Sequence, residues 1–239
     1  MAELLSRGVA VSTDVIRENL ERVNERIELA CQRVGRRVDE VTVVAVTKTH
    51  GPQAVDAVVA AGVSDIGENR VQEFLKKKAE VTRPCRWHLV GTLQRNKAGK
   101  VVGECELIHS VDRVKLAETV SRLSGERGVT TRVLLEVNTS RELTKHGFEP
   151  EEVPAAVDAI ALLPGVQLEG LMTIGPLTDD EAMVRRAFQS LFRLKHKVEG
   201  AVTNPVPHVS MGMSDDFEIA IEEGATLVRL GRVLLGPRR

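Results

Sequence analysis

Eight short apolar segments alternate with amphipathic segments along this chain of 239 residues, and this alternation limits the possible folds more than any other feature. The apolar segments carry few polar residues on either face, as expected of parallel strands that are covered on both sides. Strands and helices that alternate at this spacing form βαβ units, and eight such units predict a (β/α)₈ barrel of the TIM type. The predicted strands cover residues 41–47, 63–67, 87–91, 107–111, 132–138, 168–174, 207–211 and 226–230.

We expect a single domain over residues 1–239, because no Pro- or Ser-rich linker and no shift in composition divides the chain. Residues 1–40 are expected to form a helical extension and residues 41–236 the barrel. Apolar residues recur every three or four positions from Ile16 onward in the extension, which predicts an amphipathic helix that could close one end of the barrel. A doubly wound open sheet is the alternative, since a pattern of apolar segments can miscount strands.

The charge balance argues against two classes of partner. Asp and Glu number 34 and Lys and Arg 33, for a net charge of −1, so we expect neither nucleic acid nor an anionic membrane surface as a partner. The run Lys76-Lys77-Lys78 is most simply a solvated helix face. Residues 1–11 lack the build of a signal peptide, and no apolar run reaches the roughly 18 residues of a membrane span.

The cysteines point to the compartment. Cys31, Cys85 and Cys105 are odd in number and far apart, which predicts neither a disulfide framework nor a zinc site. With no targeting signal in the sequence, we expect a protein of the reducing cytoplasm.

Lys48 ends the first predicted strand, "VTVVAVTKTH", and barrels of this kind carry their active sites at the carboxyl ends of the strands. A lysine amine in an apolar pocket loses its proton readily and can form a Schiff base with a carbonyl group. The alternative is a side chain whose charged end simply reaches solvent. Lys48 alone leaves both interpretations open.

The last quarter of the chain carries a pattern typical of anion binding. "HVSMGMSDD" and "LVRLGR" lie at the ends of predicted strands seven and eight, where such barrels commonly hold a phosphate. Ser210 offers a hydroxyl, and Gly212 and Gly231 let backbone N–H groups approach an anion. A helix beginning near Ser214 would point its positive end toward the same mouth. Two ordinary βα turns are the alternative.

Arg229 lies in an otherwise apolar strand, so its guanidinium needs either a carboxylate such as Glu68 or Glu136, or a ligand. A lysine amine, a phosphate site and an arginine in one barrel mouth fit pyridoxal 5′-phosphate through its aldehyde, its phosphate and its ring nitrogen. A Schiff-base aldolase acting on a sugar phosphate would use the same lysine and phosphate site, but it gives Arg229 no evident role.

Six motifs resemble those of the pyridoxal phosphate homeostasis protein family, the YggS/PROSC group, in the same order from about Val41 to Gly236. They are "VAVTKTH", "DIGENRVQE", "WHLVGTLQRNK", "VNTSRELTKHGF", "GLMTIGP" and "HVSMGMSDDFEIAIEEGATLVRLG". The resemblance implies a barrel like the N-terminal domain of alanine racemase, with pyridoxal 5′-phosphate as its cofactor.

The same resemblance implies roles for individual residues. Lys48 would carry the Schiff base, Ser210 and Gly231 would contact the phosphate, and Arg229 would face the pyridine nitrogen. The other residues expected to bind the cofactor are Asn69 and His88 near the ring, Met172 at the ring face or barrel floor, Met211, Gly212 and Arg232. Arg232 departs from the family, which commonly has a threonine there whose hydroxyl helps to bind the phosphate.

Two features speak against strong catalysis. A ring nitrogen that faces an arginine stays unprotonated, and an unprotonated ring is a weak electron sink. The sequence also contains no tyrosine, whereas alanine racemase pairs its lysine with a tyrosine from a second domain. The expected function is therefore intracellular storage, delivery or buffering of the cofactor, with PLP-dependent apo-enzymes as possible partners and a monomeric state. A slow single-domain amino-acid racemase is the alternative. Lys145 and His146 follow the fifth predicted strand, most simply in an exposed loop, and the alternative is that they approach the site.

Overall fold

Eight parallel strands close into a barrel in sequence order, as the alternation predicted, because β1 pairs with both β2 and β8. The computed structural model describes residues 12–142, 144–200, 202 and 204–236. Residues 1–11, in which we expect no signal peptide, lie outside this range. The strands are β1 (Thr42–Val46), β2 (Asp65–Glu68), β3 (Arg86–Leu89), β4 (Leu107–Val111), β5 (Thr131–Glu136), β6 (Val166–Met172), β7 (His208–Ser210) and β8 (Leu227–Leu230).

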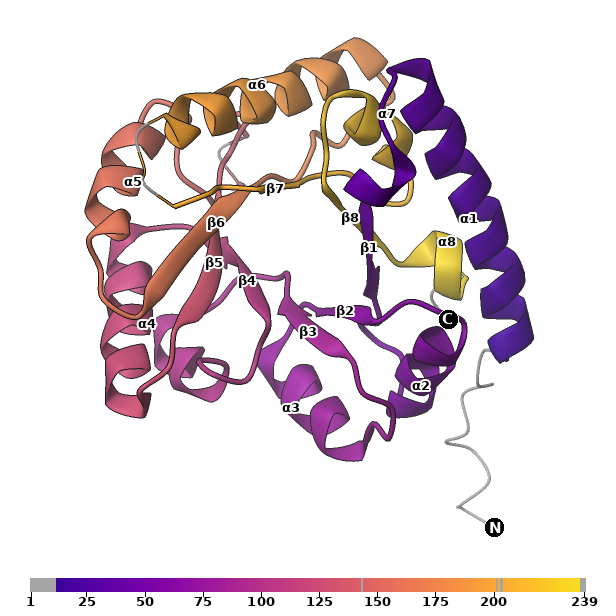
Figure 1. Cartoon of the computed structure of the whole chain (residues 1–239), viewed down its shortest axis with the longest axis horizontal. Helices are drawn as coiled ribbons and strands as arrows, with labels where there is room; N and C mark the ends of the chain where they lie inside the picture. Colours follow the sequence, from indigo (N-terminus) through magenta and orange to yellow (C-terminus); the bar gives the residue numbers. More distant parts are fainter. Residues whose placement is uncertain (1–11, 143, 201, 203, 237–239) are drawn as a thin grey trace.

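Helices surround the barrel as an outer ring (Figure 1). Two of the connecting helices are short. A 3₁₀ helix follows β3, and the helix expected to begin near Ser214 begins at Phe217, three residues later. The helical elements are α1 (Thr13–Arg33), η1 (Val38–Glu40), α2 (Pro52–Ala60), α3 (Val71–Glu80), η2 (Arg95–Lys100), α4 (Val114–Arg127), α5 (Val153–Ala161), α6 (Glu181–Glu199), α7 (Phe217–Glu222) and α8 (Arg232–Leu235).

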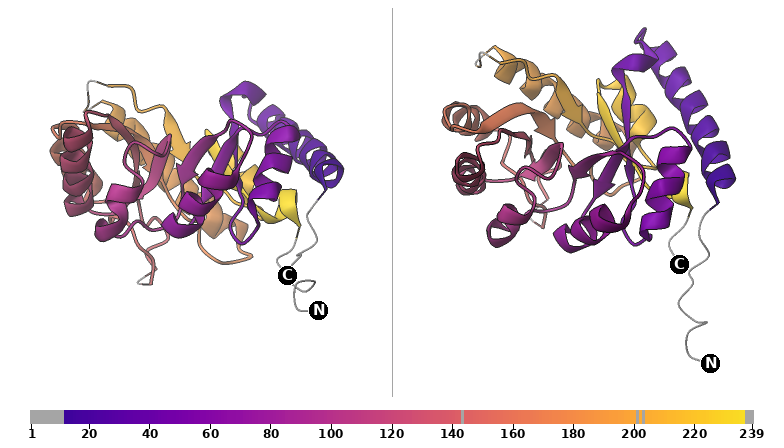
Figure 2. Two further views of the ribbon diagram at one scale, coloured as in Figure 1. Left: turned by 90° about the horizontal axis from the view of Figure 1, so that it is seen from below. Right: turned by 60° about the horizontal axis from the view of Figure 1, so that its bottom comes forward.

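Helix α1 lies along the side of the barrel and does not close an end, contrary to our expectation (Figures 1 and 2). It packs against α2, α7 and α8. The physical reason is that α7 has six residues and α8 only four, so they cover little of the strands they flank. The buried stripe of α1, which includes Leu20 and Val23, completes the helical ring there. Ser12 caps this helix by accepting a hydrogen bond from the backbone N–H of Val15 at 3.3 Å.

The space inside the barrel is partly apolar and partly polar. A small cluster of Val44, Val46, Val90, Leu107, Leu134, Met172 and Leu227 is separate from the large core between strands and helices. Buried polar residues share the interior strands with it: His88 on β3, His109 on β4, Ser210 on β7 and Arg229 on β8. Buried polar groups need hydrogen-bond partners. These four side chains form hydrogen bonds with one another. No described helix is both long and apolar enough to cross a membrane.

Candidate functional site

A cavity of about 470 Å³ opens at the carboxyl ends of the strands, where the fold places an active site. Three segments far apart in sequence supply its polar wall: the end of β1, the loop after β7 and the end of β8. It is lined by Val46, Lys48, Asn69, Val90, Ile174, Leu177, Met213, Ser214, Asp215, Arg229, Gly231 and Arg232. The structure thus brings together five of the residues expected at the cofactor: Lys48, Asn69, Arg229, Gly231 and Arg232.

Lys48 follows β1 on a backbone that is held from both sides. Thr49 has a φ of 70°, a left-handed conformation that a β-branched residue rarely adopts. Its backbone N–H donates to Glu73 Oε2 of α3 at 3.0 Å. On the other side, Lys77 Nζ donates to the carbonyl oxygen of Thr47 at 2.8 Å. The turn that carries Lys48 is therefore tied to α3 through two contacts.

Lys77 is buried, with 4% of its surface exposed, which corrects our interpretation of the lysine run as a solvated face. It forms an ion pair with Glu68 Oε1 at 2.6 Å, whereas Lys76 is exposed. Three consecutive lysines in the sequence do not show which of them is buried. Lys77 lies three residues after the buried Phe74 and therefore on the inner face of α3.

Glu68 was one of two carboxylates considered as a partner of Arg229, but it pairs with Lys77. It also accepts a hydrogen bond from Thr47 Oγ1 at 2.5 Å. Its Oε2 atom has no hydrogen-bond partner among the described residues, and burial raises the pKa of the carboxyl group. The pair is therefore buried directly beside the turn of Lys48.

Arg229 reaches the cavity wall from β8 although only 5% of it is exposed. Its Nη1 donates to Ser210 Oγ at 2.6 Å and its Nη2 to the carbonyl oxygen of Thr173 at 2.8 Å. Burial lowers the pKa of the guanidinium to about 10, against the opposing charges of Asp216 and Glu136, so it remains cationic at neutral pH. Both acceptors are neutral oxygen atoms, so neither of them neutralises the positive charge of Arg229. The guanidinium therefore lies at the cavity wall as a charged hydrogen-bond donor.

Glu136, the other carboxylate considered, affects Arg229 through its charge. Burial and then the charge of Asp112 raise the pKa of Glu136 to about 7. A buried carboxyl group of this kind is partly protonated at neutral pH.

Five of the residues expected at the cofactor do not line the cavity. Ser210 is fully buried beneath Arg229, and His88 lies deeper in the barrel, hydrogen-bonded to His109 and Asp65. Gly212 has a φ of 89°, and a Cβ there would lie 2.5 Å from Ala220 Cβ, so its role in the structure is a tight turn against α7. Met172 and Met211 are also buried in the core.

Ser214 lines the cavity, although the sequence suggested it only as a helix start. Its Oγ also accepts a hydrogen bond from the N–H of Val233 at 3.4 Å. The signal that could have found it is the second serine of "SMGMS", four residues beyond Ser210. Gly231 lies beside it at the start of α8, where a Cβ would come within 3.3 Å of the carbonyl oxygen of Val46. Arg232 forms an ion pair with Asp215 at the rim.

Of the two residues expected in an exposed loop, His146 is exposed and Lys145 is partly buried. Lys145 Nζ donates to Glu142 Oε1 at 2.7 Å and to the carbonyl oxygen of Gly175 at 2.8 Å, so it ties the loop after β5 to the loop after β6. The side chain of His146 is 60% exposed and lines a neighbouring groove of about 1110 Å³ that shares Asn69 with the cavity.

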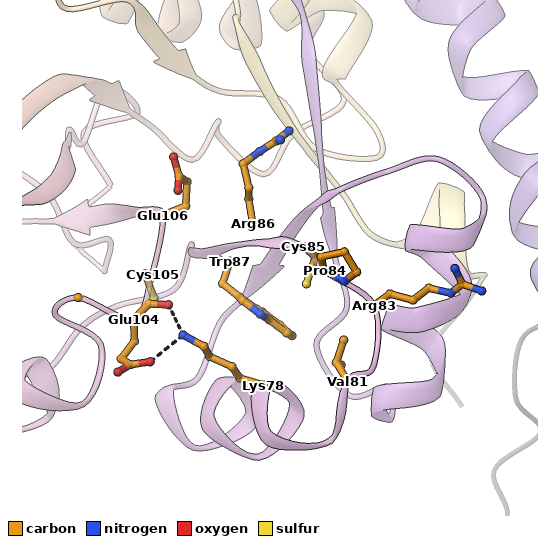
Figure 3. Close-up of a pocket in the computed structure, with 11 residues that line it drawn as sticks. Lys78, Val81, Arg83, Pro84, Cys85, Arg86, Trp87, Glu104, Cys105 and Glu106 are labelled. Carbon is orange, nitrogen blue, oxygen red and sulfur yellow. Dashed lines mark hydrogen bonds and ion pairs between the residues drawn. The ribbon is translucent and has the colours of Figure 1, made fainter.

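A second cavity, of about 380 Å³, lies at the opposite end of the barrel beside the start of β3 (Figure 3). Cys85 and Cys105 line it, and Lys78 pairs across it with Glu104. Burial raises the pKa of Cys85 to about 11 and that of Cys105 to about 12, so neither is a reactive thiolate at neutral pH. The described residues contain no cluster suited to a metal ion.

The chain is similar to known proteins over most of its length. The chain matches the family model for the alanine racemase N-terminal domain over residues 12–239. It is 42% identical over 223 residues to the pyridoxal phosphate homeostasis protein of Aquifex aeolicus, which covers 93% of this chain and 98% of that protein. A crystal structure of an unknown protein from Bifidobacterium adolescentis has a TM-score of 0.88 at 37% identity, covering 93% and 95% of the two chains. PipY of Synechococcus elongatus, whose structure has PLP bound, has a TM-score of 0.81 at 34% identity, covering 92% of this chain and all (100%) of that one.

Proposed function

Since the chain belongs to the pyridoxal phosphate homeostasis protein family, as its motifs predicted, we propose that it binds pyridoxal 5′-phosphate (PLP) in the cavity at the barrel mouth and serves PLP homeostasis inside the cell. The observation that carries the proposal is the meeting of Lys48, Arg229 and Gly231 on one cavity wall from opposite ends of the sequence. A cavity of about 470 Å³ is of ordinary size for a small-molecule site.

Each part of the cofactor has a matching group on the wall. Lys48 supplies an amine for a Schiff base with the aldehyde, and Arg229 supplies N–H donors for the pyridine nitrogen. The phosphate would lie against Ser214 and Gly231, since a hydroxyl and a residue without a Cβ adjoin there, with Arg232 as a cation at the rim. Asn69 lines the wall at the ring, while Ser210 acts beneath it through Arg229.

Arg229 also limits the chemistry. When bound, PLP supplies an electron sink whose strength depends on protonation of its ring nitrogen. A guanidinium offers only donors and gives up no proton at neutral pH, so it keeps that nitrogen unprotonated. We therefore propose storage and delivery of PLP to apo-enzymes without strong catalysis. Slow racemisation of amino acids is the alternative, and it needs a second base besides Lys48.

Uptake of the cofactor and its attachment can be measured directly. The protein mixed with PLP should develop a visible absorption band, and borohydride should fix one PLP on Lys48, as located by peptide mass spectrometry. Lys48→Ala should lose the fixed adduct and keep weaker, reversible binding. Lys76→Ala, at an exposed lysine of α3, is the matched control and should behave like the wild type. An adduct that persists in Lys48→Ala would refute the assignment of the lysine.

Transfer and turnover separate the carrier from the enzyme. The loaded protein should restore activity to a PLP-dependent apo-enzyme, and it should exchange the α-proton of amino acids slowly or not at all. Rapid exchange between D- and L-forms would refute the carrier function. Because every residue of the cavity wall comes from one barrel, we also propose that the monomer binds PLP, which light scattering of the loaded protein would test.

A further inference from the structure

A continuous chain of hydrogen bonds runs through the barrel interior and ends at the proposed cofactor site. Arg229 Nη1 contacts Ser210 Oγ at 2.6 Å, and Ser210 Oγ contacts His109 Nδ1 at 2.9 Å. His109 Nε2 contacts His88 Nδ1 at 2.9 Å, and His88 Nε2 contacts Asp65 Oδ1 at 3.0 Å. Each of the five residues is at most 6% exposed, so water does not compete for these bonds.

The chain crosses the barrel from one end to the other. Asp65 is the first residue of β2, whereas Ser210 is the last residue of β7. At the Asp65 end, Arg86 Nε donates to Asp65 Oδ1 at 2.7 Å. The chain therefore joins the cavity at the carboxyl ends of the strands to an ion pair at their amino ends.

Both ends of the chain have a fixed hydrogen-bonding role. Arg229 can only donate. Asp65 is ionised and can only accept: burial opposes ionisation, but the hydrogen bonds from His88 and Arg86 outweigh it and lower the pKa of Asp65 to about 2. Any assignment of protons in between must satisfy these two ends.

Fixed ends give every bond a single direction when the imidazoles are neutral. Asp65 only accepts, so a neutral His88 donates to it from Nε2 and accepts at Nδ1 from His109 Nε2. His109 Nδ1 then accepts the proton of Ser210, whose oxygen in turn accepts from Arg229. Burial lowers the pKa of His109 well below its usual value, which agrees with the neutral form.

We propose that Asp65, His88 and His109 are positioning residues of the cofactor site, which act through Ser210 to hold the Arg229 guanidinium in the orientation that meets the pyridine ring. The inference rests on the proposed function for its ligand. Removal of one member leaves the next with an unpaired buried donor or acceptor, so Arg229 loses its fixed anchor on one side. Thr173 then remains as its anchor on the other side.

His109→Phe tests the chain, because an aromatic ring is retained and both nitrogen atoms are lost. The probe is pyridoxine 5′-phosphate, which has the ring and phosphate of PLP but no aldehyde, so its binding reports Arg229 independently of Lys48. We expect its affinity to fall about tenfold, as for one unsatisfied buried polar group. His208→Phe is the matched control, since His208 lies on β7 two residues before Ser210, 3.8 Å from Glu169 and outside the chain. It should leave the affinity unchanged.

A double-mutant cycle separates positioning from general loss of stability. Ser210→Ala should weaken binding about as much as His109→Phe, and the double variant should lose little more than either single one, because both cut the same chain. Additive losses, or wild-type affinity in a folded His109→Phe, would overturn the proposal.

The unliganded protein provides a test without the cofactor. Long-range ¹H–¹⁵N NMR spectra of the side chains should show His88 and His109 both protonated on Nε2 and not on Nδ1. The Nδ1 form in either residue would contradict the chain, even if PLP binds as proposed. If the wild type takes up no PLP or pyridoxine 5′-phosphate but shows both Nε2 tautomers, the proposed function fails while the direction of the chain stands.

Discussion

Lys77 Nζ donates a hydrogen bond of 2.8 Å to the carbonyl oxygen of Thr47, the residue immediately before Lys48. A buried lysine on the helix after β2 thus holds the backbone of the lysine at the site. The same amine is paired with Glu68, which is fully buried. A buried ion pair therefore supports the turn that carries Lys48 at the mouth of the barrel. The pattern of charged residues along the sequence does not reveal this pair.

Replacing Lys77 by Met should destabilise the protein strongly, because Glu68 is left as a buried carboxylate without its cation. Breaking such a pair from one side costs about 3–5 kcal/mol, which urea unfolding would measure as a lower midpoint. Lys76→Met is the control and should change the free energy of unfolding by less than about 0.5 kcal/mol. The double change Lys77→Met with Glu68→Gln should recover part of the loss. Equal stability of the two single variants would contradict the buried pair.

Glu136 should make the unliganded protein less stable as the pH rises. Its pKa is raised from 4.5 to about 7 in the folded state, so the folded protein binds its proton more tightly than the unfolded chain does. Stability from this group is fully present below about pH 4.5 and is lost as the pH rises through about 7. Glu136→Gln should therefore be more stable than the wild type at pH 8, by roughly 3 kcal/mol, and nearly equal to it at pH 4. Urea unfolding at both pH values measures this, and a constant difference would contradict it.

Ser214→Ala should weaken binding of phosphate-bearing ligands specifically. Its hydroxyl lines the cavity beside Gly231, so its removal deletes one donor to the proposed phosphate. We expect about a tenfold lower affinity for PLP, in proportion to one hydrogen bond to a charged group. Pyridoxal, which lacks the phosphate, is the control ligand and should bind both proteins equally. An equal loss for both ligands would place Ser214 elsewhere than at the phosphate.

Gly212→Ala should destabilise the loop after β7. The new Cβ would lie 2.5 Å from Ala220 Cβ and 3.0 Å from Phe217 Cα, at a φ of 89°. Overpacking combined with the left-handed backbone predicts a loss of about 2–4 kcal/mol in thermal or urea unfolding. Gly125→Ala in α4, where a Cβ meets open space, is the control and should stabilise the protein by about 0.5–1 kcal/mol. A neutral effect at Gly212 would show that the turn adapts.

The sequence was sufficient to predict the barrel and the position of Lys48 and Arg229 near the carboxyl ends of its strands. Apolar segments separated by helices determine strand order, and strand ends determine which residues reach the mouth. Depth within the mouth was not predictable: Ser210 and Ser214 lie in one motif, but only Ser214 lines the cavity. The difference depends on how the turn at Gly212 folds against α7, which pattern alone does not specify.

The chain of hydrogen bonds through the barrel interior could not be predicted from the sequence either. His109 stands in the apolar run of β4 with no motif to mark it, and its partners come from strands 21 and 101 residues away. The position of α1 was predicted wrongly for a similar reason. The amphipathic pattern shows that one face is buried, whereas the surface it covers depends on the lengths of α7 and α8.

The contact of α1 with α8 has a consequence for the order of events during synthesis. Asn19 Nδ2 donates to the carbonyl oxygen of Leu234 at 2.9 Å, which joins residues 215 positions apart. The first helix therefore has α2 as an early neighbour, but it lacks its partners α7 and α8 until almost the whole chain has left the ribosome. Strand β1, which carries Lys48 at its end, likewise waits for β8 as its second neighbour. The cofactor site can thus be completed only when translation is nearly finished, so that truncated chains should be unable to bind PLP.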